Sequence, residues 1–172
     1  MAQEIFLIDS NSFITPHNQY YPFDFAPGFW DQLKDNIACG NIAILDMVKS
    51  EILHGNDDLM RWMGQLEIGN YIDHRKPEIL ERYGQVLSHI QNNPAYKPAA
   101  LEEWSRDTVA DPWLISAASA YNLTLVTFER RRGILTPASP CKNAKIPDVA
   151  DVFGVKTVSL YYMMRNLGFK LK

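Results

Sequence analysis

Cysteine and histidine are sparse in this chain, and their spacing excludes several kinds of site. The two cysteines, Cys39 and Cys141, lie far apart and form no C-x-x-C pair. We therefore expect free thiols in a reducing cytoplasm. The four histidines are scattered, and we expect them at the surface or the rim of the core. Without paired histidines or a cysteine cluster, the sequence predicts no structural zinc.

Long apolar runs are also missing. The apolar runs present are far too short to span a bilayer, and residues 1–10 lack the basic start and long apolar stretch of a signal peptide. We expect a cytoplasmic protein without a membrane partner. Neither G-x-x-x-x-G-K-[ST] nor G-x-G-x-x-G occurs, so nucleoside-triphosphate and dinucleotide chemistry have no support.

The composition is that of a folded protein with an uneven charge distribution. The chain has 172 residues, 47% of them hydrophobic, and we expect one domain over residues 1–172. Residues 1–129 contain 18 Asp and Glu against 8 Lys and Arg, whereas residues 130–172 contain 2 against 9. An acidic body with a basic end is suited to holding metal in one place and phosphates in another. The basic residues equally well serve only to balance the acidic body.

Apolar periodicity predicts an alternation of strands and helices. Short buried runs predict strands, and runs with helical spacing predict helices. The expected strands are 5–8, 42–45, 123–128 and 155–158, and the expected helices are 29–38, 46–54, 77–91, 98–104, 111–121 and 160–167, with another beginning at 57. This order favours an α/β fold with a mostly parallel sheet and helices on both faces.

Four carboxylates are predicted to meet at one edge of that sheet. Asp9 directly follows the first strand, and Glu129 directly follows the strand 123–128. Asp111 is expected to cap the helix before that strand, and Glu51 falls on or beside the apolar stripe of the helix 46–54. In parallel sheets, sites lie beyond the carboxyl ends of the strands, at the switch of strand order. Such carboxylates repel unless a cation neutralises them, and oxygen-only ligands suit Mg²⁺ or Mn²⁺.

Each acid also has a simpler interpretation. Asp111 is suited to a plain helix cap, and Asp9 to a turn residue ending a strand. Glu129 can pair with one of Arg130, Arg131 and Arg132. Because all four carboxylates fall at the same edge of the predicted sheet, we favour the interpretation as a metal site.

Short motifs in the chain resemble those of the PIN-domain nucleases. Residues 8–14 (IDSNSFI) resemble their opening strand and turn, and residues 48–53 (VKSEIL) their second acidic position. Residues 110–118 (ADPWLISAA), with 125–129 (LVTFE), resemble their third acidic helix and the strand after it. Residues 145–149 (KIPDV) resemble the segment before the last strand. The aromatic stretch from 20 to 30 looks more specifically like an uncharacterised bacterial PIN-like branch.

The resemblance implies a three-layer α/β/α fold and cleavage of RNA that depends on Mg²⁺ or Mn²⁺. Many relatives are the toxins of toxin–antitoxin pairs, often homodimeric, which implies an antitoxin protein as partner. The residues carried over by position are the catalytic, metal-binding acids Asp9, Glu51, Asp111 and Glu129, the supporting residues Ser10, Asn11 and Thr127, and a late ligand, Asp148. Arg130, Arg131 and Arg132 are expected to bind phosphates, a sequence-blind interaction.

The chain also departs from the family pattern. The fourth acid is usually Asp and is Glu129 here, and an Asp often found shortly after it is replaced by arginines. One alternative is therefore a nucleic-acid-binding or protein-binding module with an impaired site. Another is a phosphatase with Asp9 as nucleophile, although such enzymes usually need a second Asp where this chain has Asn11.

Overall fold

A parallel sheet forms the middle of the protein. A computed structural model describes residues 3–171. The five strands are all parallel, in the order β3-β2-β1-β4-β5. Their bounds are β1 Phe6–Ile8, β2 Ile42–Leu45, β3 Tyr71–Ile72, β4 Thr124–Val126 and β5 Thr157–Val158. The strand order reverses between β1 and β4, and this is the switch point of the sheet.

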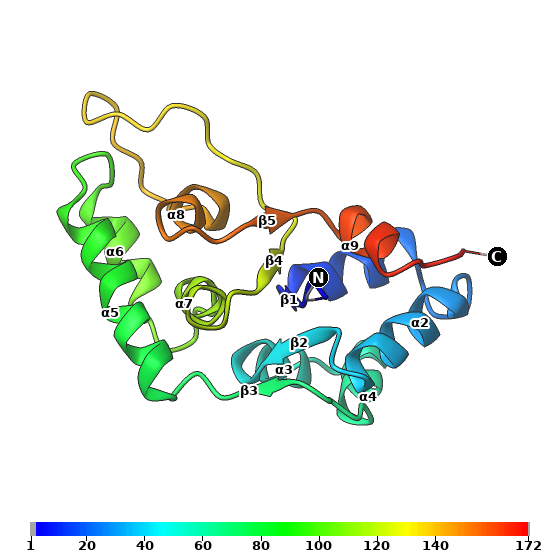
Figure 1. Cartoon of the computed structure of the whole chain (residues 1–172). Coiled ribbons are helices and arrows are strands. Elements are labelled where there is room, and N and C mark those ends of the chain that lie inside the picture. Colours follow the sequence, from blue (N-terminus) through cyan, green and yellow to red (C-terminus); the bar gives the residue numbers. More distant parts are fainter. Residues whose placement is uncertain (1–2, 172) are drawn as a thin grey trace.

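Helices cover both faces of the sheet. Figure 1 shows α5 to α8 on one side of it, and α2, α4 and α9 on the other. The helices are α1 Asn11–Thr15, the π-helical turn η1 Pro16–Tyr20, α2 Pro27–Ala38, α3 Asp46–Leu53, α4 Asp58–Gly64, α5 Pro77–Asn92, α6 Pro98–Trp104, α7 Asp111–Tyr121, α8 Ile146–Val152 and α9 Leu160–Asn166. The three-layer α/β/α arrangement confirms the predicted fold class.

The central strands are buried throughout. Every residue of β1, β2 and β4 is buried, as expected for parallel strands covered on both faces. Helix α7 lies against them and buries all seven residues from Pro112 to Ala118. It ends at Asn122, whose left-handed φ of 53° forms the turn into β4. Asn122 is the stop predicted from the sequence.

Three local predictions are wrong. The expected turn after Asp9 is the start of α1, since the chain becomes helical at Asn11. Strand β3 was not predicted because its two residues, Tyr71 and Ile72, carry no periodic signal. The apolar pattern of residues 77–91 also predicts that Leu80 faces the core, but Leu80 is 46% exposed. The buried residues of α5 are Ile79 and the residues two and three turns further on, Val86 and Ile90, and Leu80 lies beside that line.

The aromatic segment before α2 packs mostly on itself and on the core. Phe23 lies 4.4 Å from Trp30 between ring centroids, and Tyr21 lies 4.6 Å from Phe29. The indole N–H of Trp30 donates to the backbone oxygen of Tyr21 at 2.6 Å. Tyr21 and Phe23 thus pack on α2, whereas Tyr20 and Phe25 are exposed.

The amino edge of the sheet holds one well-paired carboxylate. Glu4, just before β1, accepts from the Thr124 hydroxyl at 2.6 Å and from the Lys156 ammonium at 2.8 Å. Tyr162 and Asn166 donate to its other oxygen at 3.2 and 3.3 Å. Burial raises the pKa of Glu4, but the hydrogen bonds from Lys156 and Thr124 outweigh it and leave this pKa below its ordinary value.

Candidate metal centre

Asp9 and Thr127 stand side by side where β1 and β4 end. Ile8 pairs with Val126 in the register of the two strands, so the next residue of each strand reaches the same edge. The backbone N–H of Asp9 donates to the oxygen of Val126 at 3.0 Å. This is the switch point of the sheet, where ligands bind in parallel α/β folds.

The Asp9 carboxylate is almost completely buried. It is 2% exposed and accepts hydrogen bonds from Thr127 Oγ1 at 3.1 Å and Ser10 Oγ at 3.3 Å. Burial is the main reason that its pKa rises to about 6, and the nearby charges of Glu129 and Glu51 raise it further against the two hydrogen bonds. An anion held in this position favours a bound cation.

Asp111 lies at the start of α7, and its negative charge is also disfavoured by its surroundings. The helix boundary differs by one residue from the prediction, since Ala110 is the N-cap and Asp111 the first helical residue. Burial raises the pKa of Asp111 to about 7, with further increases from the charges of Asp9, Glu129 and Glu51. Lys145 acts in the opposite direction. Asp9 and Asp111 therefore share one field of negative charge.

Glu129 is held by two donors from consecutive residues. Its Oε1 accepts from the Lys145 ammonium at 2.9 Å, and its Oε2 accepts from the backbone N–H of Ile146 at 2.8 Å. Its own backbone N–H donates to Thr127 Oγ1 at 3.1 Å. The Thr127 hydroxyl thus bridges Glu129 and Asp9. None of the expected partners Arg130–Arg132 pairs with the Glu129 carboxylate among residues 3–171.

Glu51 lies at the rim of a pocket. It is exposed on α3 and lines a cavity of about 460 Å³ with residues that include His54, His74 and Asp107. Its charge contributes to the raised pKa of both Asp9 and Asp111. All four predicted acids are therefore close enough to interact electrostatically.

A second acidic group, not predicted from the sequence, lies beside this pocket. Asp46, Asp73 and His74 are the one set of three or more candidate ligands in the described residues whose donor atoms lie within 4.8 Å of each other. They follow the carboxyl ends of β2 and β3, so the missed strand β3 explains why sequence reasoning did not find them.

The carboxylates of the second group already have partners within the protein. His74 Nδ1 lies 2.7 Å from Asp46 Oδ2, and Arg75 holds both carboxylate oxygens of Asp73 at 2.9 and 3.0 Å. The hydrogen bonds from Arg75 lower the pKa of Asp73 to about 2. The group is compatible with metal binding, but Asp9 and Asp111 have the greater need of a cation.

The remaining predicted residues divide by their contacts. Ser10 and Thr127 both contact Asp9 as expected. Asn11 is exposed at the start of α1, and no hydrogen bond within residues 3–171 joins its side chain to the four acids. The Asp148 carboxylate accepts from the backbone N–H of Arg132 at 3.1 Å. For Asn11 and Asp148, the proposed roles stay predictions.

The three arginines differ in how they are engaged. Arg131 donates to both oxygens of Asp151 at 2.7 and 2.8 Å. Arg132 donates to the backbone oxygen of Asn143 at 3.2 Å. The Arg130 side chain, in contrast, forms no ion pair with any residue that the structure describes. Arg130 is therefore the arginine best placed to bind an external phosphate.

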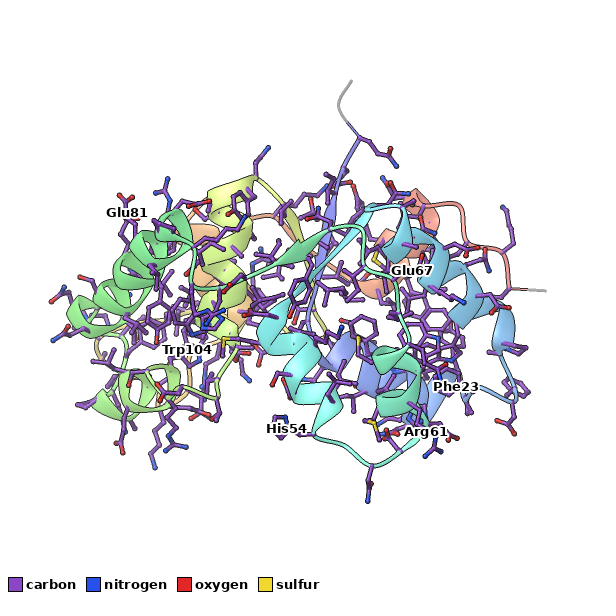
Figure 2. The ribbon with its side chains drawn as sticks, turned by 90° about the horizontal axis from the view of Figure 1, so that it is seen from below. Phe23, His54, Arg61, Glu67, Glu81 and Trp104 are labelled. Carbon is purple, nitrogen blue, oxygen red and sulfur yellow. The ribbon has the colours of Figure 1, made fainter. Side chains whose placement is uncertain are left out.

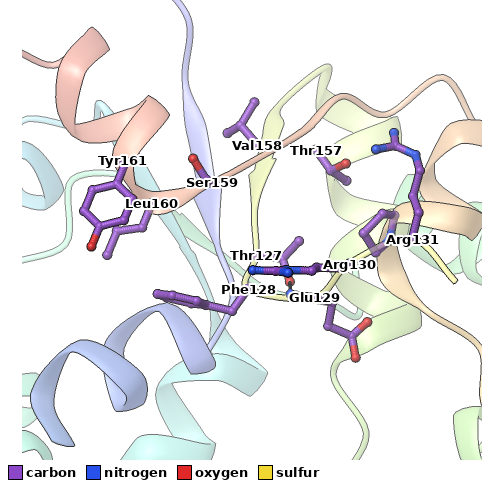
Figure 3. A pocket seen from close by; sticks show the side chains of 11 residues that line it. Thr127, Phe128, Glu129, Arg130, Arg131, Thr157, Val158, Ser159, Leu160 and Tyr161 are labelled. Carbon is purple, nitrogen blue, oxygen red and sulfur yellow. Dashed lines mark hydrogen bonds between the residues drawn. The ribbon is translucent and has the colours of Figure 1, made fainter. Parts of the chain in front are cut away.

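A pocket adjoins the acidic centre at the ends of β4 and β5. It has a volume of about 420 Å³ and is lined by residues 127–131, Pro147 and residues 157–161. Figure 3 shows Arg130 between Phe128 and Glu129 in its wall, with Tyr161 across from Thr157. Basic, aromatic and hydroxyl groups thus surround a hollow beside the acids. Figure 2 shows His54, which lines the other pocket with Glu51, at the end of α3.

The donor set fits a hard divalent cation. Asp9 is buried and Asp111 half-buried, both have raised pKa values, and the four carboxylates offer the oxygen ligands that Mg²⁺ and Mn²⁺ prefer. Within residues 3–171, no three of these four acids have ligand atoms within 4.8 Å of one another. No helix in residues 3–171 has the length and apolarity needed to cross a membrane.

The comparisons with known proteins agree with this architecture. No curated protein matches the chain in sequence. A chain in the crystal structure of VapBC2 from Rickettsia felis, bound to a DNA fragment from their promoter, is similar with a TM-score of 0.52. The two are 15% identical, and the match covers 90% of this chain and 98% of that one. With its five parallel strands and flanking helices, the protein has a PIN-like fold. Residues 6–171 match the family described as "Domain of unknown function (DUF4411)", to which this chain therefore belongs.

Proposed function

We propose that this protein is a ribonuclease that hydrolyses RNA phosphodiester bonds with the help of Mg²⁺ or Mn²⁺. The observation that carries the proposal is the buried Asp9 beside the half-buried Asp111, which both meet the charges of Glu129 and Glu51 at the switch point. Burying several like charges is unfavourable without a counter-ion. A site of this kind is retained for a function rather than for stability.

The chain's own residues provide the scaffold for this chemistry. A divalent cation held in the centre formed by Asp9, Glu51, Asp111 and Glu129 would supply Lewis acidity and neutralise charge on the attacked phosphate. Thr127 and Ser10 orient Asp9 through their hydroxyls. Arg130 is positioned to bind a neighbouring phosphate, and the pocket beside it has room for a nucleotide of a single strand.

The fold also supports a more specific role. Its likeness to a chain of VapBC2 and the motifs shared with PIN toxins favour a toxin that acts in the cytoplasm, with an antitoxin protein as partner and a homodimer as the assembly. Co-expression with a candidate antitoxin, followed by size-exclusion chromatography with light scattering, tests both associations. A chain that elutes alone as a monomer contradicts them.

The decisive experiment is a cleavage assay on structured and single-stranded RNA with Mg²⁺, Mn²⁺ or EDTA. We expect metal-dependent cleavage by the wild type, none by Asp9→Asn, and cleavage retained by Asp46→Asn. The last variant is the matched control, since Asp46 belongs to the second acidic group. Full activity of folded Asp9→Asn contradicts the proposal, and loss of activity in Asp46→Asn alone transfers the site to the second group.

The alternative is a binding module without catalytic activity. It is favoured by one observation, the engagement of both Glu129 oxygens by protein donors. Calorimetric titration with Mn²⁺ separates the two functions. The nuclease should bind Mn²⁺ and lose this binding in Asp9→Asn, whereas the binding module should retain RNA binding equally in Mn²⁺ and in EDTA.

A further inference from the structure

Lys145 places a positive charge inside the acidic centre. Its ammonium lies 2.9 Å from Glu129 Oε1, and its charge acts on Asp111 as well, because it lowers the pKa of that carboxyl. Lys145 therefore lies within the field of two of the four acids, which come from different elements of the fold.

The backbone holds Lys145 in this position. It is the extended N-cap residue of α8, with φ −121° and ψ 137°, and the two residues after it, Ile146 and Pro147, are buried. Since the N–H of Ile146 binds the other oxygen of Glu129 at 2.8 Å, consecutive residues hold the carboxylate from both sides. An exposed ion pair contributes little, but this one combines a charge with a backbone donor on a rigid segment.

Glu129 already has a cation of the protein beside it. Each oxygen already accepts a hydrogen bond from a charged or backbone donor. Asp9, in contrast, accepts two hydroxyl hydrogen bonds, which leave its negative charge unneutralised. The acids of the centre therefore differ: within residues 3–171, Asp9 and Asp111 lack a protein cation that balances their charge, whereas Glu129 is paired with the ammonium of Lys145.

We propose that Lys145 replaces a second divalent cation in this centre. Its ammonium neutralises Glu129, so the chain binds one divalent ion, through Asp9, Asp111 and Glu51. An ammonium has three N–H donors, and Glu129 uses one, which leaves two for oxygen atoms of the substrate phosphate. This inference rests on the proposed function, because it specifies how the same centre is charged.

The test is the number of Mn²⁺ ions bound per chain, measured by calorimetry and by electron paramagnetic resonance. We expect one ion for the wild type and for Lys145→Arg, which keeps the charge. Lys145→Gln frees Glu129 and should bind two ions whose spins are coupled. The double variant Lys145→Gln/Glu129→Gln should return to one. The same titration of Asp46→Asn identifies any ion held by the second acidic group, so that it can be subtracted.

The outcomes separate this inference from the proposed function. Two coupled ions in the wild type overturn the replacement but leave the nuclease standing, and this result does not depend on the folding of any variant. One ion in folded Lys145→Gln, judged by circular dichroism, also overturns the replacement. Absence of Mn²⁺ binding in the wild type, or equal binding by Asp9→Asn, overturns both.

Discussion

The Thr127 hydroxyl donates to Asp9 Oδ2 at 3.1 Å and thereby joins the ends of β4 and β1, 118 positions apart in the sequence. The hydroxyl oxygen of Thr127 also accepts a hydrogen bond from the backbone N–H of Glu129 at 3.1 Å. This one hydroxyl therefore orients the Asp9 carboxylate and fixes the backbone of Glu129.

Replacing Thr127 should therefore disturb the metal centre more than the fold. Thr127→Val keeps the shape but removes the hydrogen bonds, and we expect about 10- to 100-fold loss in Mn²⁺ affinity or in cleavage rate. Thr127→Ser retains the hydroxyl and should stay within a few-fold of the wild type. Equal losses in both variants, measured by calorimetry and RNA cleavage, would mean that the methyl group matters rather than the hydroxyl.

Stability without metal should depend on pH through Asp9 and Asp111. Their pKa values of about 6 and about 7 in the folded protein lie above those of ordinary carboxyls. Between pH 4 and pH 7 the unfolded chain releases these protons while the folded protein retains them, so the unfolding free energy falls as the pH rises. The loss due to Asp9 is roughly 3 kcal/mol.

Urea unfolding in EDTA at several pH values measures this effect. Asp9→Asn should have a flatter profile and should be more stable than the wild type above pH 7. Saturating Mn²⁺ should restore stability to the wild type at pH 8 but not to the variant. A wild-type profile in EDTA that is flat over this range contradicts the electrostatic description.

The arginines after β4 should contribute unequally to RNA binding. Arg130→Gln is expected to reduce the slope of log affinity against log salt by about 0.7, the value for one phosphate contact on a single strand. Arg131→Gln is the matched control, since Arg131 is paired with Asp151, and should leave the slope unchanged. Fluorescence anisotropy on a short single-stranded RNA in Ca²⁺ measures both slopes. A larger effect from Arg131 would show that its ion pair opens on binding.

Trp30 should be important for stability rather than for activity. Its side chain is 2% exposed and packs against Phe23, so Trp30→Ala should cost about 3–5 kcal/mol of unfolding free energy. Trp30→Phe keeps much of the packing but leaves the Tyr21 oxygen without its donor, for about 1–3 kcal/mol. Thermal unfolding gives both values, and losses under 1 kcal/mol in both would indicate a loosely packed segment.

The fold could be predicted from the sequence because its main elements have strong local signals. The apolar run of β1, the apolar run of β2 and the proline-started α7 are read directly from residue patterns. Strand β3 has two residues and is defined by its pairing with Ile44 and Leu45 of β2, so it has no local signal in the sequence. The helical residues after Asp9 were misread because small polar residues suit both turns and helix starts.

The candidate site could be predicted only in part. The topology indicates the carboxylates that follow strand ends, Asp9 and Glu129, and the helix-start signal of α7 indicates Asp111. The topology does not indicate which distant side chain pairs with each of these acids. The pairing of Lys145 with Glu129, and of His74 with Asp46, depends on tertiary distances that no spacing in the sequence encodes.

The contrast between Glu4 and Asp9 has a consequence for how this protein can change. Glu4, at the amino edge of the sheet, is satisfied by four protein donors. Asp9, five residues after Glu4 and three after Phe6, is left with an unbalanced charge at the other edge. A single short strand thus separates a residue that serves folding from one that serves a ligand. Mutations near the amino ends of the strands should alter how much protein accumulates, and mutations near the carboxyl ends should alter what the accumulated protein does. An evolving or engineered variant can therefore tune abundance and activity independently.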